Sequence, residues 1–188
     1  MESLPIQSIR LKVKVATPEV VAPFGQILGP NPNIAPLPID FYGGAATVRR
    51  VVDFESDDQT ELTLVTLDRR PLEVRWMERH FKHTPAFIPL SGRPFVIVMA
   101  PPNDDELPDL DKVEAFLFDG SAGFTLRKGT WHEFPFALVD GTNVIVILRK
   151  EATRDLMKDN VIQDEAFGPD LDKKDLRARK KVVYEIEL

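Results

Sequence analysis

The sequence predicts an all-β domain, a small barrel or sandwich with a polar pocket, and three observations support this prediction. Short runs rich in β-branched and aromatic residues recur at close spacing, with turn residues between them. Sixteen prolines against ten glycines indicate many short elements that end at turns. The three histidines fall in two short segments, 80–83 and 128–132, each next to a strand-like run. Ionisable groups are therefore expected to gather at one end of the β frame.

Length and composition fit a single domain spanning residues 1–188. A net charge of -6 with scattered acidic residues argues against nucleic-acid binding. The chain has no apolar run of roughly 18 residues, and residues 1–5 lack a signal-peptide pattern, so no membrane association is expected. The lack of cysteine excludes disulfides and thiolate chemistry, and it makes the cytoplasm the expected compartment.

The N-terminal part predicts a strand, a short helix and a long loop. Apolar and basic residues alternate over 6–15, which predicts a strand. Thr17 before Pro18 predicts a helix start, and this helix should end near Gly25. The Gly- and Pro-rich stretch 29–44 is expected to be a loop, either a lid over the pocket or a surface excursion.

The central part predicts most of the β frame. Alternation over 72–77 predicts a strand with one wet face, and it places Glu78 and His80 together on the opposite face. Residues 86–90 and 95–100 are expected to form two strands that meet at the Ser91-Gly92 turn. The acidic run 103–111 is expected to be a solvated loop. Further strands are predicted at 47–54 and 61–67, separated by the acidic turn 55–58, and at 113–118, 123–127, 134–139 and 143–148.

The last part, 151–188, is predicted to be a C-terminal extension of the domain. Residues 151–159 have helical character, and the strongly charged stretch 170–181 predicts a solvated helix. Alternation over 182–188 predicts an edge strand, which could pair within the chain or with a second subunit. A homodimer is therefore expected.

Four titratable residues form the candidate catalytic set: Glu78, His80, His83 and His132. A histidine can give and take protons at neutral pH, and a nearby carboxylate fixes its tautomer. A single histidine could equally be a hydrogen-bonded structural residue, but the clustering of all three favours a function. Cations are available to bind a small carboxylate substrate; they are Arg79, Lys82, Arg127 and Lys128. Glu133 is either a second base or a surface carboxylate.

Residues 78–92 resemble a known family. Glu78-Arg79-His80, Thr84 and Ala86–Leu90 with Gly92 match the central motif of the ureidoglycolate lyase family. Weaker echoes of the family follow in the Phe95–Val98 strand, the Pro108–Leu110 turn before Ala115-Phe116, the Pro23–Ile27 opening helix, and Gly123, Lys128, Trp131 and His132. The resemblance covers about residues 8–150.

The resemblance implies a cupin-like β-barrel of the double-stranded β-helix or jelly-roll type, with a few short helices and usually dimeric. It implies a lyase that splits ureidoglycolate into glyoxylate and urea in purine and allantoin catabolism. Cleavage of this hemiaminal needs a base, an acid and a cation for the carboxylate. His132 is expected to be the acid or base, with Glu78 and His80 as its partners. The expected substrate-binding residues are Arg79, Lys128, Arg127 and His83.

A divalent metal such as nickel or manganese is one cofactor that these residues could hold, and the sequence leaves its presence open. The cupin signature has two histidines at i and i+2, a later glutamate, and a histidine on the second hairpin. Lys82 stands two residues after His80, and no glutamate follows until Glu106, so the first motif is broken. Lys128–His132 resembles the second motif.

Several positions depart from the family pattern: Met77, Pro85, Leu126, Arg127, Lys128 and Glu133. Some of them are expected in the pocket, which keeps two alternatives open. One is an enzyme of the same fold, acting as a lyase, isomerase or decarboxylase on another small carboxylate. The other is a non-catalytic module that binds a small molecule, which would lack a proton-transfer pair.

Overall fold

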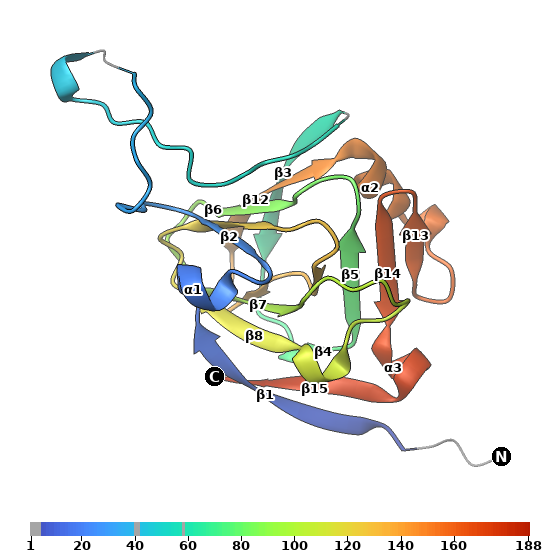
Figure 1. The fold of residues 1–188 in the computed structure, drawn as a ribbon. Coiled ribbons are helices and arrows are strands. Elements are labelled where there is room, and N and C mark those ends of the chain that lie inside the picture. Colours follow the sequence, from blue (N-terminus) through green and yellow to red (C-terminus); the bar gives the residue numbers. More distant parts are fainter. Residues whose placement is uncertain (1–4, 40–41, 58) are drawn as a thin grey trace.

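Two curved β-sheets build the computed structural model, which describes residues 5–39, 42–57 and 59–188 (Figure 1). The larger sheet has the strand order β13-β14-β5-β10-β7-β8-β1-β15-β4, with β11 beside β7. The smaller sheet has the order β2-β9-β6-β12-β3. The strands are β1 (Gln7–Val15), β2 (Gly25–Leu28), β3 (Thr60–Leu67), β4 (Glu73–Val74), β5 (Trp76–His80), β6 (Ala86–Pro89), β7 (Phe95–Ala100), β8 (Glu114–Phe118), β9 (Gly123–Leu126), β10 (Trp131–His132), β11 (Phe136–Ala137), β12 (Thr142–Arg149), β13 (Ala166–Gly168), β14 (Leu171–Asp175) and β15 (Val182–Glu187).

Helices are few and short, which confirms the all-β fold class with a few short helices. They are α1 (Pro18–Val21), α2 (Lys150–Asp155) and α3 (Leu176–Lys180), with the 3₁₀ turns η1 (Tyr42–Gly44), η2 (Leu110–Lys112) and η3 (Lys158–Asn160). None of the helices in the described part of the chain has the length and apolar character needed to cross a membrane.

Strand β7 explains how the core is divided. Phe95, Ile97 and Met99 point into a cluster shared with β6, β9 and β12 of the smaller sheet. Val96, Val98 and Ala100 point to the other face of the same sheet, where they pack against β5, β10 and β15. Because both faces are covered, all six residues of β7 are buried, and the strand has the unbroken apolar sequence typical of a fully buried strand.

The two strands expected on either side of the Ser91-Gly92 turn are present as β6 and β7, but their pairing as a hairpin is wrong. β6 pairs with β9 and β12, whereas β7 pairs with β8, β10 and β11, so the two strands lie in different sheets. The Ser91-Gly92 turn instead carries the chain from one sheet to the other, and Gly92 has a φ of 62°, which glycine adopts without steric cost.

The segment between β2 and β3 differs most from expectation. The strand expected at 47–54 is absent among the described residues. Isolated bonds hold this stretch, from Leu37 N to Val48 O and from Asp53 N to Gln26 Oε1, and they do not form a strand ladder. The loop extends away from the sheets instead of covering them as a lid (Figure 1). Positions 40–41 of the expected loop and Asp58 of the acidic turn lie outside the described residues.

The remaining predictions for residues 6–148 are largely confirmed. Thr17 caps α1, with its Oγ1 accepting a bond from Val20 N at 3.4 Å, and Pro18 takes the first helical position. The chain then enters β2 at Gly25, a strand that the sequence did not predict. The strands at 6–15, 61–67, 113–118, 123–127 and 143–148 are present, 72–77 is split into β4 and β5, and 134–139 is reduced to β11.

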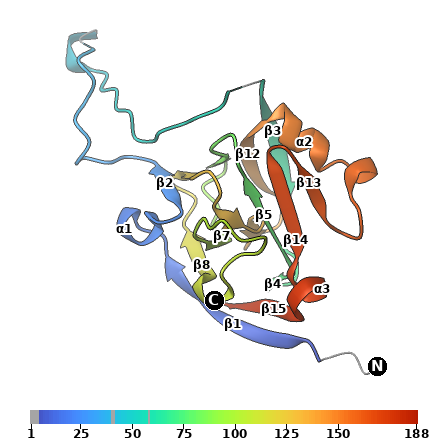
Figure 2. The same ribbon diagram turned by 45° about the vertical axis from the view of Figure 1, so that its right-hand side comes forward.

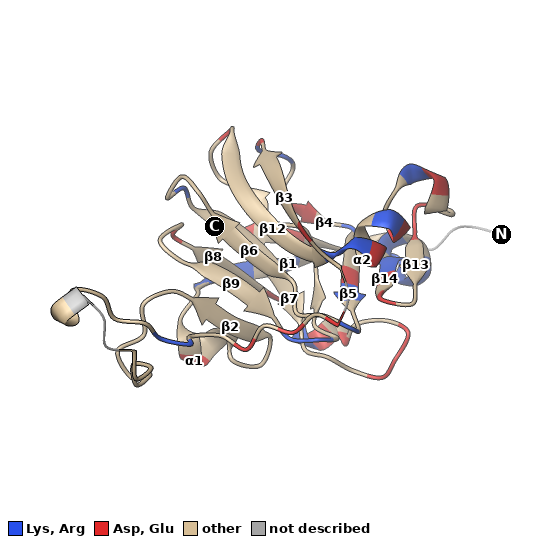
Figure 3. Ribbon diagram, turned by 90° about the horizontal axis from the view of Figure 1, so that it is seen from above, with Lys and Arg blue, Asp and Glu red and all other residues tan. Residues whose placement is uncertain are grey.

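The C-terminal stretch packs into the larger sheet. Helix α2 matches the helical character of 151–159, but the helix expected over 170–181 begins only at Leu176. Residues 171–175 are strand β14, which lies antiparallel beside β5 (Figure 2). The edge strand expected at 182–188 is also wrong, because β15 lies between β1 and β4. Charged residues gather along β5, β14 and α2, whereas β6, β8 and β9 are mostly uncharged (Figure 3).

Candidate active site

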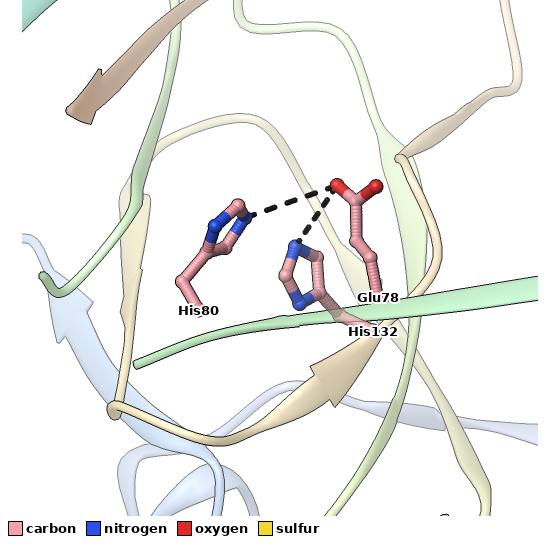
Figure 4. Close-up of side chains that lie close together, drawn as sticks. All are labelled: Glu78, His80 and His132. Carbon is pink, nitrogen blue, oxygen red and sulfur yellow. Dashed lines mark ion pairs between the residues drawn. The ribbon is translucent and has the colours of Figure 1, made fainter. Parts of the chain in front are cut away.

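Strands β5 and β10 bring a carboxylate and two imidazoles together between the sheets. Glu78 and His80 are two residues apart on β5 and share a face, and His132 on β10 pairs directly with Glu78. His132 Nε2 lies 3.5 Å and His80 Nε2 lies 4.0 Å from the same oxygen, Glu78 Oε1 (Figure 4). All three side chains are at most 5% exposed. The structure therefore brings together the three residues expected to be catalytic.

The tautomer of His132 makes this contact unusual. Its Nδ1 lies 3.1 Å from the carbonyl oxygen of Thr130, which can only accept, so Nδ1 carries the hydrogen. A neutral His132 would then direct the Nε2 lone pair at a carboxylate oxygen. His132 Nε2 and both ring nitrogens of His80 are buried with no hydrogen-bond partner among the described residues. A proton or a cation between Glu78 Oε1 and the ring nitrogens that carry lone pairs would satisfy these acceptors.

Lys173 of β14 binds the other oxygen of Glu78. Its Nζ donates to Glu78 Oε2 at 2.8 Å, because Lys173 is the register partner of Glu78. Burial alone would raise the pKa of Glu78, but Lys173 and His132 bring this pKa well below its usual range. Burial and the nearby His132 lower the pKa of His80 to about 3, so His80 is a neutral imidazole at physiological pH.

Glu133 is a second carboxylate of the site and is not a surface residue. Its Oε1 accepts bonds from the backbone N of Phe134 at 3.0 Å and from Arg70 at 3.3 Å. Burial raises the pKa of Glu133, although Lys173 and Arg70 act in the opposite direction. The pKa values of Glu78 and Glu133 are thus pushed apart, as in sites that assign base and acid roles to two carboxyl groups.

His83 belongs to an adjoining cluster around Asp170. Its Nδ1 lies 2.7 Å from Asp170 Oδ2, and its ring centroid lies 4.7 Å from that of His80. Asp170 Oδ1 accepts from the backbone N of Phe81 and Lys82 at 3.0 and 2.6 Å. Burial alone would raise the pKa of Asp170, but these donors lower it to about 2. The Asp170 carboxylate therefore fixes the His83 tautomer and leaves His83 Nε2 as a lone pair toward the cluster.

Arg79 lies on the opposite face of β5 from the catalytic candidates. It is the register partner of Asp172 and bonds to that carboxylate at 3.2 Å. It also donates to the carbonyl oxygen of Asn103 at 2.9 Å, and its guanidinium lies 4.2 Å from the centre of the Trp131 ring. The structure does not bring Arg79 to the histidine cluster.

Arg127 and Lys128 also lie apart from the histidines. They line a pocket of about 340 Å³, whose lining includes Glu55 and Thr84 but none of the histidines. Lys128 is paired with Glu55, and Arg127 Nε donates to the carbonyl oxygen of Ala22 at 3.0 Å. The carboxylate clamp expected from these residues is therefore not at the cluster.

Two overlapping sets of donor atoms fit a divalent metal. Glu78, His80 and His132 offer atoms within 4.8 Å of one another, and so do His80, His83 and Asp170. Nitrogen and oxygen donors suit nickel or manganese. Both Asp170 oxygens already accept hydrogen bonds, whereas His132 Nε2 and both ring nitrogens of His80 have no partner among the described residues. Glu78, His80 and His132 therefore fit the ion better.

Comparison with known proteins places the chain in a family. The sequence model of the ureidoglycolate lyase family matches residues 8–167. The chain belongs to the ureidoglycolate lyase family. A ureidoglycolate lyase of Azotobacter vinelandii is 43% identical over 82 residues, covering 44% of this chain and 48% of that relative. One from Burkholderia mallei is 31% identical over 156 residues, covering 80% of this chain and 89% of that relative. RmlC from Streptococcus suis, solved in complex with dTDP-D-xylose, aligns at a TM-score of 0.30 and 9% identity, covering 49% of this chain and 43% of that chain.

The family match ends before β14. Glu78, His80, His83, His132 and Glu133 fall inside the match to the ureidoglycolate lyase family, whereas Asp170 and Lys173 fall beyond it. Sequence reasoning missed these two residues because their stretch was predicted to be a solvated helix. The available signal was the position of Leu171, an apolar residue between acidic ones, which the structure buries on β14.

Proposed function

We propose that this chain is a ureidoglycolate lyase that splits ureidoglycolate into glyoxylate and urea. The observation that carries the proposal is the buried group of Glu78, His132 and Glu133, in which one carboxyl has a lowered pKa and another a raised one. Membership of the family supports the substrate, and the opposed pKa values favour an enzyme over a module that only binds.

The reaction moves one proton from oxygen to nitrogen. A base takes the proton of the substrate hydroxyl, the carbon–oxygen bond becomes a carbonyl, and the carbon–nitrogen bond breaks. An acid then protonates the departing nitrogen, so urea leaves as a neutral molecule and glyoxylate keeps the carboxylate. His132 Nε2 is the proposed base, because its lone pair has no other partner. Glu78 stabilises the resulting imidazolium, and Glu133, with its raised pKa, is the proposed acid.

Glu78, His80 and His132 would hold a divalent cation such as nickel or manganese, which when bound supplies a Lewis acid to polarise the hydroxyl and carboxylate. Glu133 is not among these three residues. With a cation bound, Glu133 would be the group that transfers the proton from the substrate hydroxyl to the departing nitrogen.

The test is glyoxylate release from racemic ureidoglycolate, measured with and without added nickel or manganese. The proposal predicts release above the rate of the uncatalysed reaction in at least one condition. Folded protein that releases no glyoxylate in either condition contradicts it, and a same-fold enzyme for another small carboxylate then takes its place.

We further propose a homodimer that works in the cytoplasm on the allantoin route. The support for the dimer is the outer face of the smaller sheet, where the end strand β3 exposes Leu62 and Leu64 by 68% and 63%. These two residues pair with Ile147 and Ile145 on β12, so the apolar side chains form one patch. Sedimentation should give twice the 21.3 kDa chain mass, and Leu64→Lys should shift it to the monomer. A wild-type monomer at micromolar concentration contradicts the dimer.

A further inference from the structure

Two cations connect the buried cluster to solvent. The side chains of Glu78 and Glu133 are each 5% exposed. The cations that bind them are more exposed, with Lys173 at 23% and Arg70 at 36%. Lys173 Nζ is 2.8 Å from Glu78, and Arg70 is 3.3 Å from Glu133. A ligand that approaches these carboxylates from this side therefore meets the two cations first.

Both cations are held in place before a ligand arrives. Arg70 donates to the carbonyl oxygen of Phe134 at 2.6 Å, and its guanidinium stacks 3.8 Å from the centre of the Phe136 ring. Lys173 is fixed by the β14–β5 register and by its bond to Glu78. An ammonium has three donors, so one bond to Glu78 leaves donors for an anion. Pre-positioned donors reduce the ordering cost of binding.

We propose that Lys173 and Arg70 receive the carboxylate of the substrate and so restrict this site to small carboxylates. This inference rests on the proposed lyase function and assigns its substrate clamp. It moves the clamp from Arg79, Arg127 and Lys128, which lie elsewhere, to Lys173 on β14, beyond the family match, and to Arg70, inside that match. Without the two cations, an entering carboxylate would face the ionised Glu78 and would be repelled.

The test compares three substitutions on the full-length protein. Lys173→Met and Arg70→Met remove each cation while keeping an apolar side chain of similar reach. Lys174→Met is the matched control, because Lys174 is the next residue of β14 and binds Asp172 at 3.0 Å and Glu106 at 3.4 Å instead of Glu78. Steady-state kinetics on ureidoglycolate are paired with calorimetric binding of glyoxylate, the small carboxylate product.

Lys173→Met and Arg70→Met should each raise KM by about tenfold or more and change kcat less than KM, since a clamp binds ground and transition states equally. Lys173→Met should also lower kcat to some extent, because Lys173 helps to keep the pKa of Glu78 low. Glyoxylate binding should weaken by a similar factor. Lys174→Met should change neither quantity by more than about twofold. Lys173→Arg should recover part of the loss, because it restores the charge.

Loss of kcat in Lys173→Met with KM and glyoxylate affinity unchanged overturns the clamp while leaving the lyase function intact. If the wild type releases no glyoxylate from ureidoglycolate but binds glyoxylate, and Lys173→Met abolishes this binding, the clamp stands and the lyase function fails. A wild type that neither turns over ureidoglycolate nor binds glyoxylate overturns both. Should Lys173→Met not fold, Arg70→Met and Lys173→Arg decide the same question.

Discussion

The two faces of β5 carry charged groups that are equally buried but differently paired. On one face Arg79 directs its two terminal nitrogens at acceptors, the carbonyl of Asn103 and Asp172, and leaves only its Nε without a partner among the described residues. On the other face His80 Nε2 and His132 Nε2 both approach Glu78 Oε1, and neither nitrogen has a hydrogen-bond partner among the described residues. Matched donors and acceptors make an anchor, whereas converging acceptors leave a place for a proton, a cation or a substrate group. Burial of charge alone therefore does not distinguish the two faces; the pairing does.

The largest expected effect comes from the unmatched face. His132→Ala should lower kcat by about two to four orders of magnitude, the usual range for a positioned acid or base. The thermal unfolding midpoint should fall little, because only Nδ1 of the imidazole makes a hydrogen bond and Nε2 has no partner among the described residues. Glyoxylate release measures the first quantity and calorimetry the second. Full activity in this variant would leave the family assignment standing and remove His132 from the mechanism.

The matched face should respond in the opposite way. Arg79→Met leaves Asp172 without its arginine and should lower the free energy of unfolding by about 3 kcal/mol, with kcat changed by less than about threefold. Urea unfolding and steady-state kinetics at 25 °C measure the two quantities. A second substitution, Asp172→Leu, should restore part of the stability, because it removes a buried carboxylate that is left with Lys174 as its remaining cation. A large loss of kcat in stable Arg79→Met would show that the two faces are not separate.

A pH series sharpens the comparison at the adjoining His83–Asp170 pair. The folded-state pKa of Asp170 is about 2 against an ordinary value of 3.8, so the unfolded chain takes up this proton first. The stabilisation is therefore complete above about pH 4 and is lost as the pH falls toward 2. Its size is about 2 kcal/mol. Asp170→Asn should flatten this part of the curve of unfolding free energy against pH, and an unchanged acid limb would contradict the assignment.

The smallest effect is expected at Lys128, one of the four residues that the sequence predicted to bind the substrate. The structure pairs it with Glu55 at an exposed position, where ion pairs contribute little. Lys128→Ala should change KM for ureidoglycolate by less than about twofold. A tenfold rise in KM would return the clamp to the pocket of Arg127 and Lys128.

The sequence predicted the centre of the site because local patterns encode it. Glu78 and His80 share a strand face by simple alternation, and the scarcity of histidine made the 128–132 segment conspicuous. Lys173 and Asp170 could not be predicted in this way. Their partners lie 95 and 87 residues away. The sequence of a charged stretch does not reveal which distant carboxylate or imidazole its side chains will pair with. The prediction that β6 and β7 pair with each other was wrong for a similar reason, since a tight turn does not specify whether the next strand stays in the same sheet.

The position of β15 has a consequence for how the molecule assembles. It lies parallel to β1, with Gln7 opposite Val182. The strand that precedes it, β14, pairs with β5, so this edge of β5 is also completed only by the C-terminal part of the chain. Pairings between such distant segments are slow to form, because a long stretch must be closed before any contact is gained. During synthesis one edge of β5 therefore stays unpaired until β14 has been made. An unpaired strand edge can form hydrogen bonds with strands of other chains and so lead to aggregation. Refolding of this protein should be slow, with aggregation rising steeply with concentration until β14 docks.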